Sequence, residues 1–231
     1  LHAFCHAVPG KWHVMGVMLS AAGSFQWYKN QFGMEEQRIE KEGGANAYET
    51  LTKEAQQVIA GSEGLFFLPY LSGERTPHPD PYARGCFIGM SLRHQKKHHT
   101  RAVLEGVSYG LNDSLSMMKE LGVNPNEIIL SGGGSRSALW KQMLADIFAT
   151  PCAMVNALEG AAYGAAILAA VGVGGFGSVQ EACSSFIQKI ETVDPGPNLE
   201  TYKRNYPIYK SLYPSLKTQF AKIAESNAVN S

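Results

Sequence analysis

Short apolar runs alternate with segments of helical periodicity along this chain, and that alternation restricts the fold more than any other feature. The runs at 65–68 and 128–130 are continuous and apolar, as expected of strands that are covered on both faces, and residues 152–156 are a further expected strand. Between the first two runs, an apolar residue returns at every fourth position from Val103 to Leu115, which predicts a long helix with one buried stripe. Strands that alternate with helices indicate the α/β class with a central sheet.

The remaining segments fit the same class. Residues 2–8 and 12–19 have the character of two strands, and the turn sequence PGK between them predicts a hairpin. Ser20 is suited to cap a helix whose apolar and aromatic residues recur until Gly33. The further expected elements are a helix over 48–60, an irregular proline-rich segment over 69–84, a strand over 87–90, helices over 139–147 and 161–171, and a mostly helical tail.

The composition is that of a single globular domain. Of the 231 residues, 45% are hydrophobic and 17% are charged, which provides enough apolar material for one sizeable core. Because 20 basic residues balance 20 acidic ones, no long-range field favours nucleic acid or an anionic membrane. No apolar run reaches the roughly 18 residues of a membrane span. We therefore expect no nucleic-acid partner and no membrane partner.

The cysteines and the first residue indicate the setting of the protein. Cys5, Cys86, Cys152 and Cys183 are widely separated and form no C-x-x-C pair, which favours a reducing, cytoplasmic location. The chain opens on Leu1 rather than on methionine, and its first residues already have the character of a strand. We therefore expect that further sequence precedes this residue.

The sharpest local signal is the sequence IILSGGGSRS at 128–137, in which three glycines join a buried strand to a helix. Glycines let backbone N–H groups approach a ligand, and the positive end of the following helix points to the same place. The arrangement suits a nucleotide, but it matches neither G-x-x-x-x-G-K-[ST] nor G-x-G-x-x-G. On this motif alone, an ordinary glycine-rich turn between a strand and a helix is an equal alternative.

Several motifs accompany the glycine run in a fixed order. They are LSGERTP at 71–77, RGCFIGM at 84–90 with RAVLEG at 101–106, the run 131–146, and EGAAYGAA at 159–166. Together they resemble the C-terminal half of the FGGY carbohydrate kinases. The sequences HAFCHA at 2–7 and WHVMGVMLSAA at 12–22 resemble the xylulokinase branch most, and the likeness covers residues 1–215. His99 departs from the aliphatic residue usual in the family, which affects the subfamily assignment more than the function.

The resemblance implies a fold of the actin, hexokinase and Hsp70 type (ribonuclease H-like), with a central mixed sheet flanked by helices. Residues 1–231 would then be the C-terminal, ATP-binding domain, and the N-terminal, sugar-binding lobe of the same protein would be its partner. ATP and Mg²⁺ are the expected cofactors and a small sugar the expected substrate, while a homodimer stays open. The residues expected to contact ATP are Gly132, Gly133, Gly134 and Ser137 beside the adenine and ribose, and Ala22, Gly23 and Gln26 near the phosphates.

The residues expected near the phosphates are also suited to this position by their chemistry. Gly23 allows close approach at a helix N-terminus, and Gln26 can donate a hydrogen bond. The alternative for Gln26 is a solvated surface glutamine. No metal-ligating residue is assigned in the chain.

No catalytic residue is assigned within the chain either. Phosphoryl transfer needs a base that accepts the hydroxyl proton, and the resemblance places this aspartate, with a Ser/Thr-Gly-Thr phosphate hairpin, before Leu1. The isolated chain is therefore expected to be inactive. The predicted reaction transfers the γ-phosphate of ATP to D-xylulose and yields D-xylulose 5-phosphate. Ribulose, gluconate and glycerol kinases are alternatives within the family, and a non-catalytic actin-like nucleotide-binding module is an alternative of another class.

Four clusters of polar residues have simpler interpretations than catalysis. We expect that His94, His98 and His99 lie in the solvated, basic start of a helix, and that Glu74 and Arg75 stabilise their own loop. Arg101 and Glu105 form an i,i+4 helix pair that contributes little to stability if it is exposed. The helical spacing of four tyrosines predicts a face that packs on the domain: Tyr202, Tyr206, Tyr209 and Tyr213.

Overall fold

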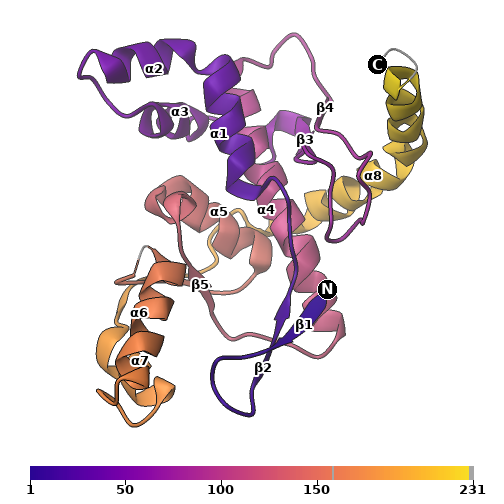
Figure 1. Ribbon diagram of the computed structural model, residues 1–231. Helices are drawn as coiled ribbons and strands as arrows, with labels where there is room; N and C mark the ends of the chain where they lie inside the picture. Colours follow the sequence, from indigo (N-terminus) through magenta and orange to yellow (C-terminus); the bar gives the residue numbers. More distant parts are fainter. Residues whose placement is uncertain (158, 229–231) are drawn as a thin grey trace.

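The computed structural model describes residues 1–157 and 159–228, and it confirms the expected α/β class (Figure 1). Its α-helices are α1 (Ala21–Phe32), α2 (Met34–Lys41), α3 (Ala47–Ala55), α4 (Lys96–Glu120), α5 (Ala138–Phe148), α6 (Gly160–Gly172), α7 (Val179–Phe186) and α8 (Leu199–Ala228). Its strands are β1 (His2–Cys5), β2 (Trp12–Met15), β3 (Phe66–Leu68), β4 (Cys86–Ile88), β5 (Ile128–Leu130), β6 (Cys152–Val155) and β7 (Lys189–Val193). Two single-turn 3-10 helices, η1 (Ser62–Gly64) and η2 (Gly133–Arg136), precede β3 and α5.

The strands pair in three small sheets within the described part of the chain. β1 and β2 form the predicted antiparallel hairpin, with Cys5 opposite Trp12. β3 pairs with β4 in a second antiparallel sheet. β5 runs parallel to β6, and β6 pairs antiparallel with β7, so this three-stranded sheet is mixed. The strand content is thus divided among three sheets, whereas the sequence pattern predicted a single central one.

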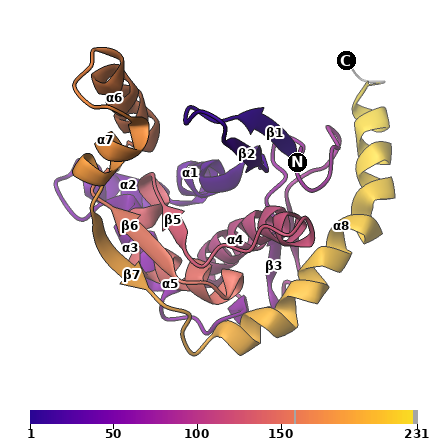
Figure 2. The same ribbon diagram turned by 90° about the horizontal axis from the view of Figure 1, so that it is seen from below.

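α4 is the centre of the core (Figure 2). Residues 100–110 of this helix are buried on every side, because α1, α3, α5, α8 and β3 all pack against it. Small residues let its neighbours approach closely: a Cβ placed on Gly106 would lie 2.1 Å from the carbonyl oxygen of Phe67 in β3. α4 therefore sets the relative positions of α1, α3 and α5, which surround the cavity described below.

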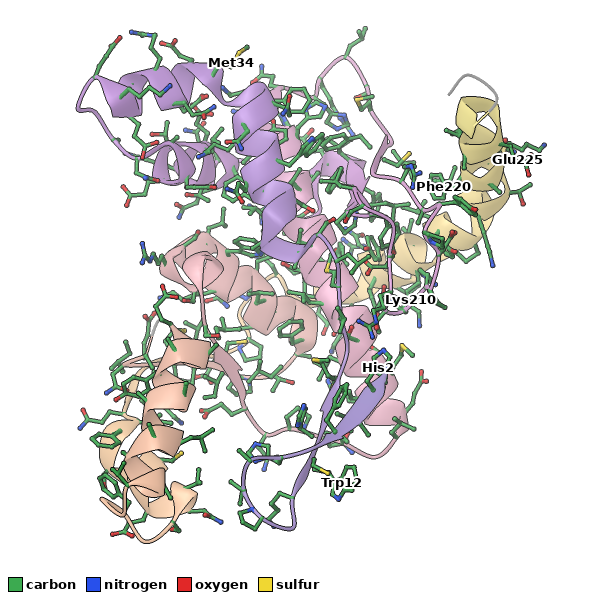
Figure 3. The ribbon with its side chains drawn as sticks, in the orientation of Figure 1. His2, Trp12, Met34, Lys210, Phe220 and Glu225 are labelled. Carbon is green, nitrogen blue, oxygen red and sulfur yellow. The ribbon has the colours of Figure 1, made fainter. Side chains whose placement is uncertain are left out.

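α8 packs along one side of this core. The tyrosines expected to form a packing face do so, since all are buried or half-buried: Tyr202, Tyr206, Tyr209 and Tyr213. Pro207 and Pro214 lie within the helix, which bends along its length (Figure 2), as expected where proline removes backbone hydrogen bonds. Figure 3 shows Phe220 on the side of α8 that faces the protein and Glu225 on the opposite side, in agreement with the burial of Phe220.

Two elements were not predicted from the sequence. α2 begins directly after Gly33, and its first turn carries Glu35, which forms an ion pair at 2.7 Å with Arg38. β7 interrupts the tail that was expected to be mostly helical, and most of its side chains are exposed. A strand with few buried side chains carries little periodic signal, and its pairing with β6 determines its conformation.

Two charged groups differ from the expectations. Arg101 and Glu105 are only 4% and 2% exposed, and Arg101 Nε donates to Glu105 Oε1 at 2.8 Å. The Tyr202 hydroxyl donates to the same oxygen at 3.1 Å, so the pair belongs to a buried network. The prediction of a solvated helix start is wrong for His98, because this side chain is buried. Its Nδ1 accepts the Gln95 N–H at 2.9 Å at the beginning of α4.

No helix in the described part of the chain has the length and the apolar character needed to cross a membrane. All four cysteines are free thiols, and Cys152 is the buried one among them. Burial raises the pKa of the Cys152 thiol to about 12.

Candidate nucleotide site

A cavity of about 550 Å³ opens between α1, α3 and the glycine segment that leads into α5. This volume lies in the range of roughly 300–1,000 Å³ that small-molecule sites occupy. Six of the seven residues expected at ATP line it, and Gly132 is the exception. The complete lining consists of Ala22, Gly23, Phe25, Gln26, Asn46, Tyr48, Glu49, Thr52, Gly133, Gly134, Arg136, Ser137 and Trp140. Residues separated by more than 100 positions in the sequence therefore meet at one site.

The α1 side of the cavity presents an open helix N-terminus. Ser20 precedes the helix but makes no side-chain cap, because its Oγ lies 2.8 Å from the Oγ of Ser72. The first turn contains no acidic residue, and a Cβ on Gly23 would meet no atom within 4 Å. Ala22, Gly23 and Gln26 line the cavity beside these backbone N–H groups. Such a helix end can hold an anion.

The glycine side of the cavity combines three different requirements. Gly132 has φ +81° and ψ −176°, a conformation open almost only to glycine, so it shapes the turn without lining the cavity. Gly133 faces open space, since an added Cβ would meet nothing within 4 Å. Gly134 lies against the ring of Trp140, with an added Cβ only 3.1 Å from Cζ3. Ser137 caps α5 by accepting the Trp140 N–H at 3.3 Å.

Aromatic rings form one wall of the cavity. Phe25 packs edge-on against Trp140 and Tyr48, with ring centroids 6.0 and 5.2 Å apart. The indole Nε1 of Trp140 donates to Ser108 Oγ at 3.0 Å, and Ser108 is fully buried in α4. This hydrogen bond fixes the indole ring, so the wall is ordered without a ligand. Flat apolar surfaces of this kind suit a planar base.

Sequence reasoning missed the contribution of α3. Asn46 caps this helix by accepting the N–H groups of Tyr48 and Glu49 at 3.0 and 3.4 Å. Asn46, Tyr48, Glu49 and Thr52 all line the cavity. An asparagine after the pair Gly43-Gly44 signals a helix start, but nothing local shows that this helix reaches the glycine run some 90 residues further on.

Arg136 was also missed, and it adds a cationic side chain to the cavity lining. Its signal in the sequence is a basic residue directly after the glycine run. A guanidinium can pair with phosphate or stack on a ring. The described residues hold no group of three or more histidine, cysteine or carboxylate side chains that could bind a metal ion. The lining is thus equipped to bind a polar, partly aromatic ligand.

Comparisons with known proteins assign the chain to a family. Residues 1–173 match the C-terminal domain of the FGGY family of carbohydrate kinases. A xylulose kinase of Staphylococcus epidermidis is 39% identical over 218 residues, which are 94% of this chain and 42% of that protein. A gluconokinase of Bacillus subtilis is 34% identical over 227 residues, which cover 96% of this chain and 44% of that protein.

The crystal structure of xylulose kinase from Rhodospirillum rubrum superimposes with a TM-score of 0.81 at 31% identity. The match covers 95% of this chain and 43% of that one, and it supports the predicted actin- and hexokinase-like fold. The chain therefore spans less than half the length of the relatives that it matches. On these grounds the chain belongs to the FGGY family of carbohydrate kinases and corresponds to their C-terminal domain.

Proposed function

We propose that residues 1–231 form the ATP-binding domain of a sugar kinase that transfers the γ-phosphate of ATP to a hydroxyl group of D-xylulose. The observation that carries the proposal is the convergence of Gly133, Gly134 and Ser137 with Ala22, Gly23 and Gln26 on one cavity of suitable size. The resemblance to the kinase family predicted these residues as ATP contacts, and they come from two segments far apart in the chain.

The cavity suggests how the chain would hold the nucleotide. The adenine and ribose would lie against Gly133 and Gly134, beside the wall that Phe25, Tyr48 and Trp140 form. The phosphates would point toward the N-terminus of α1, where first-turn N–H groups lack a side-chain cap. Gln26 would donate a hydrogen bond from the same helix.

The remaining parts of the reaction belong to a second lobe in this proposal. The base that accepts the sugar proton, the phosphate hairpin and the sugar pocket would come from an N-terminal lobe of the same protein. Mg²⁺ supplies charge neutralisation of the phosphates when it is bound. Since the described residues offer no carboxylate cluster for it, the nucleotide and the second lobe would provide its ligands. We place the protein in the cytoplasm, as its free cysteines suggest.

The choice of D-xylulose rests on relatives rather than on a pocket in this chain. The xylulose kinase of Staphylococcus epidermidis is 39% identical and the gluconokinase of Bacillus subtilis 34% identical, so gluconate is an alternative substrate. Activity of the full-length protein on xylulose, ribulose, gluconate and glycerol, measured side by side, would decide among them. A full-length protein that binds ATP but phosphorylates none of these sugars would favour a nucleotide-binding module.

The proposal is tested by titrating the isolated chain and the two-lobe protein with ATP and with adenosine. If the two-lobe protein binds ATP with a Kd of ~0.1–1 mM, the binding free energy is roughly −4 to −5.5 kcal/mol. Loss of the phosphate hairpin and its charge-assisted hydrogen bonds should cost about 2 kcal/mol net, a factor of ~30 in Kd. The isolated chain should thus bind ATP at several millimolar or weaker, while adenosine should be affected much less. Equal ATP affinity of both proteins would refute this division of the site.

A further inference from the structure

The segment that leads into α1 is hydrogen-bonded to the proline-rich segment 69–84. The Val17 N–H donates to Thr76 Oγ1 at 3.1 Å, and the Thr76 N–H donates to the Val17 carbonyl oxygen at 3.0 Å. Two residues further on, the Leu19 N–H donates to Glu74 Oε1 at 3.1 Å. These three bonds connect positions 55 or more residues apart, so no local sequence preference would set the same geometry.

The two side chains that make these contacts are deeply buried. Glu74 is 4% exposed and Thr76 is 2% exposed. Glu74 Oε1 also accepts the N–H of Arg75 at 2.7 Å, whereas Oε2 is buried without a hydrogen-bond partner. Burial raises the pKa of the Glu74 carboxyl. A buried carboxyl group that is only half satisfied costs free energy, so a stabilising role for its own loop does not fully explain it.

The loop that carries Glu74 is itself held from behind. Glu74 and Asp80 exchange two backbone hydrogen bonds, of 2.9 and 3.0 Å. The Tyr213 hydroxyl of α8 donates to Asp80 Oδ2 at 2.8 Å. The loop is therefore anchored to α8 on one side and holds the start of α1 on the other.

The start of α1 matters because it borders the cavity. Ala22 and Gly23, which line the cavity, lie only three and four positions after Leu19. The same loop also engages Ser20, whose Oγ pairs with the Oγ of Ser72 instead of capping the helix. A helix end without a side-chain cap keeps its N–H groups free for an anion, provided that the helix start is held in position.

We propose that Glu74 and Thr76 are positioning residues, which hold the N-terminus of α1 at the phosphate end of the bound nucleotide. This inference rests on the proposed function, since it assigns the phosphates to the α1 side of the cavity. Neither side chain lines the cavity, so each acts through the backbone of residues 17–19. Displacement of this backbone would move the phosphate site and leave the adenine site at Gly133 and Trp140 in place.

The test uses the two-lobe protein and measures ATP and adenosine affinities by calorimetry for two pairs of variants. Glu74→Ala and Thr76→Val remove the acceptors, and Glu74→Gln and Thr76→Ser retain an acceptor oxygen at the same place. We expect Glu74→Ala and Thr76→Val to weaken ATP binding about tenfold, with adenosine binding changed less than about twofold. Glu74→Gln and Thr76→Ser should recover most of the lost ATP affinity. Glu181→Ala is the matched control, since Glu181 in α7 accepts the backbone N–H of Gly177 at 2.8 Å and does not line the cavity.

The ratio of the two affinities separates positioning from a merely structural role, which would weaken ATP and adenosine alike. Equal losses for both ligands in a folded variant, or wild-type ATP affinity in Thr76→Val, would overturn the inference. If Glu74→Ala does not fold, the nearly isosteric pair at Thr76 decides. A wild-type protein that binds neither ATP nor adenosine would instead overturn the proposed function, and this inference with it.

Discussion

The substitution Gly133→Val separates nucleotide binding from folding. A Cβ placed on Gly133 meets no atom within 4 Å, and the residue lines the cavity. The added side chain therefore has room in the free protein, and we expect the free energy of unfolding to change by less than about 1 kcal/mol. The two neighbouring glycines differ: Gly132→Ala should cost about 1–3 kcal/mol because of its φ of +81°, and Gly134→Ala would press on the Trp140 ring.

The effect on nucleotide affinity should be large. The isopropyl group would occupy the space assigned to the adenine ring, between Gly133 and the aromatic wall. Contacts of a base with an aromatic surface contribute roughly 1–3 kcal/mol, and their loss corresponds to a factor of about 5 to 150 in Kd. ATP and adenosine should be weakened equally, because the change affects the base that both share. This pattern contrasts with the selective loss of ATP expected at Thr76.

The assay is calorimetric titration of the two-lobe protein, with urea unfolding to verify that the variant is folded. Gly172→Val is the matched control, since an added Cβ at Gly172 also meets nothing within 4 Å and this residue does not line the cavity. The reasoning is refuted if folded Gly133→Val protein binds ATP and adenosine as the wild type does.

Three further predictions concern stability and activity. Glu105→Ala should lower the free energy of unfolding by about 3–5 kcal/mol, because the charged Arg101 guanidinium would stay buried without its carboxylate partner. Urea titration measures this free energy, and a loss below about 1 kcal/mol would contradict the prediction. Burial raises the pKa of Asp113 from 3.8 to about 6, so the Asp113 carboxyl binds its proton more tightly in the folded than in the unfolded protein. The folded protein therefore loses up to about 3 kcal/mol of stability as pH rises from about 4 to 6. Asp113→Asn should flatten that part of the stability profile, and an unchanged slope would argue against it. The isolated chain should show no xylulose-dependent ADP release, and turnover by purified chain would disprove the assignment of the base to another lobe.

The local pattern was sufficient for most of the elements. The hairpin, α1, α4, β5, α5, β6 and α6 all fall close to the predicted positions, because each has an apolar period, an apolar run or a clear turn or stop signal. Gly33 follows α1 as expected. The missed elements, α2 and β7, are short and mostly exposed, so burial left little periodicity in their sequences.

The candidate site could be predicted only in part for a related reason. The glycine run and the start of α1 carry local signals, and both reach the cavity. Tyr48 and Trp140 have no such signal, since an aromatic residue in a helix is typical of any core. Their position on the wall depends on how α3 and α5 pack on α4.

The sequence by itself determined the α/β class, the order of its elements and, through its ordered motifs, the kinase family. These features depend on residues close together in the chain, where spacing and composition act directly on the backbone. Only the tertiary structure decided that Glu105 is buried, that the strands form separate sheets and that Glu74 supports α1. The burial of Glu105 and the support of α1 depend on contacts between segments more than 40 residues apart, which burial against α4 and α8 brings together. The separation of the sheets depends on which strands pair with one another. Local periodicity contains no information about such contacts, because it shows which face of an element is buried but not what covers it.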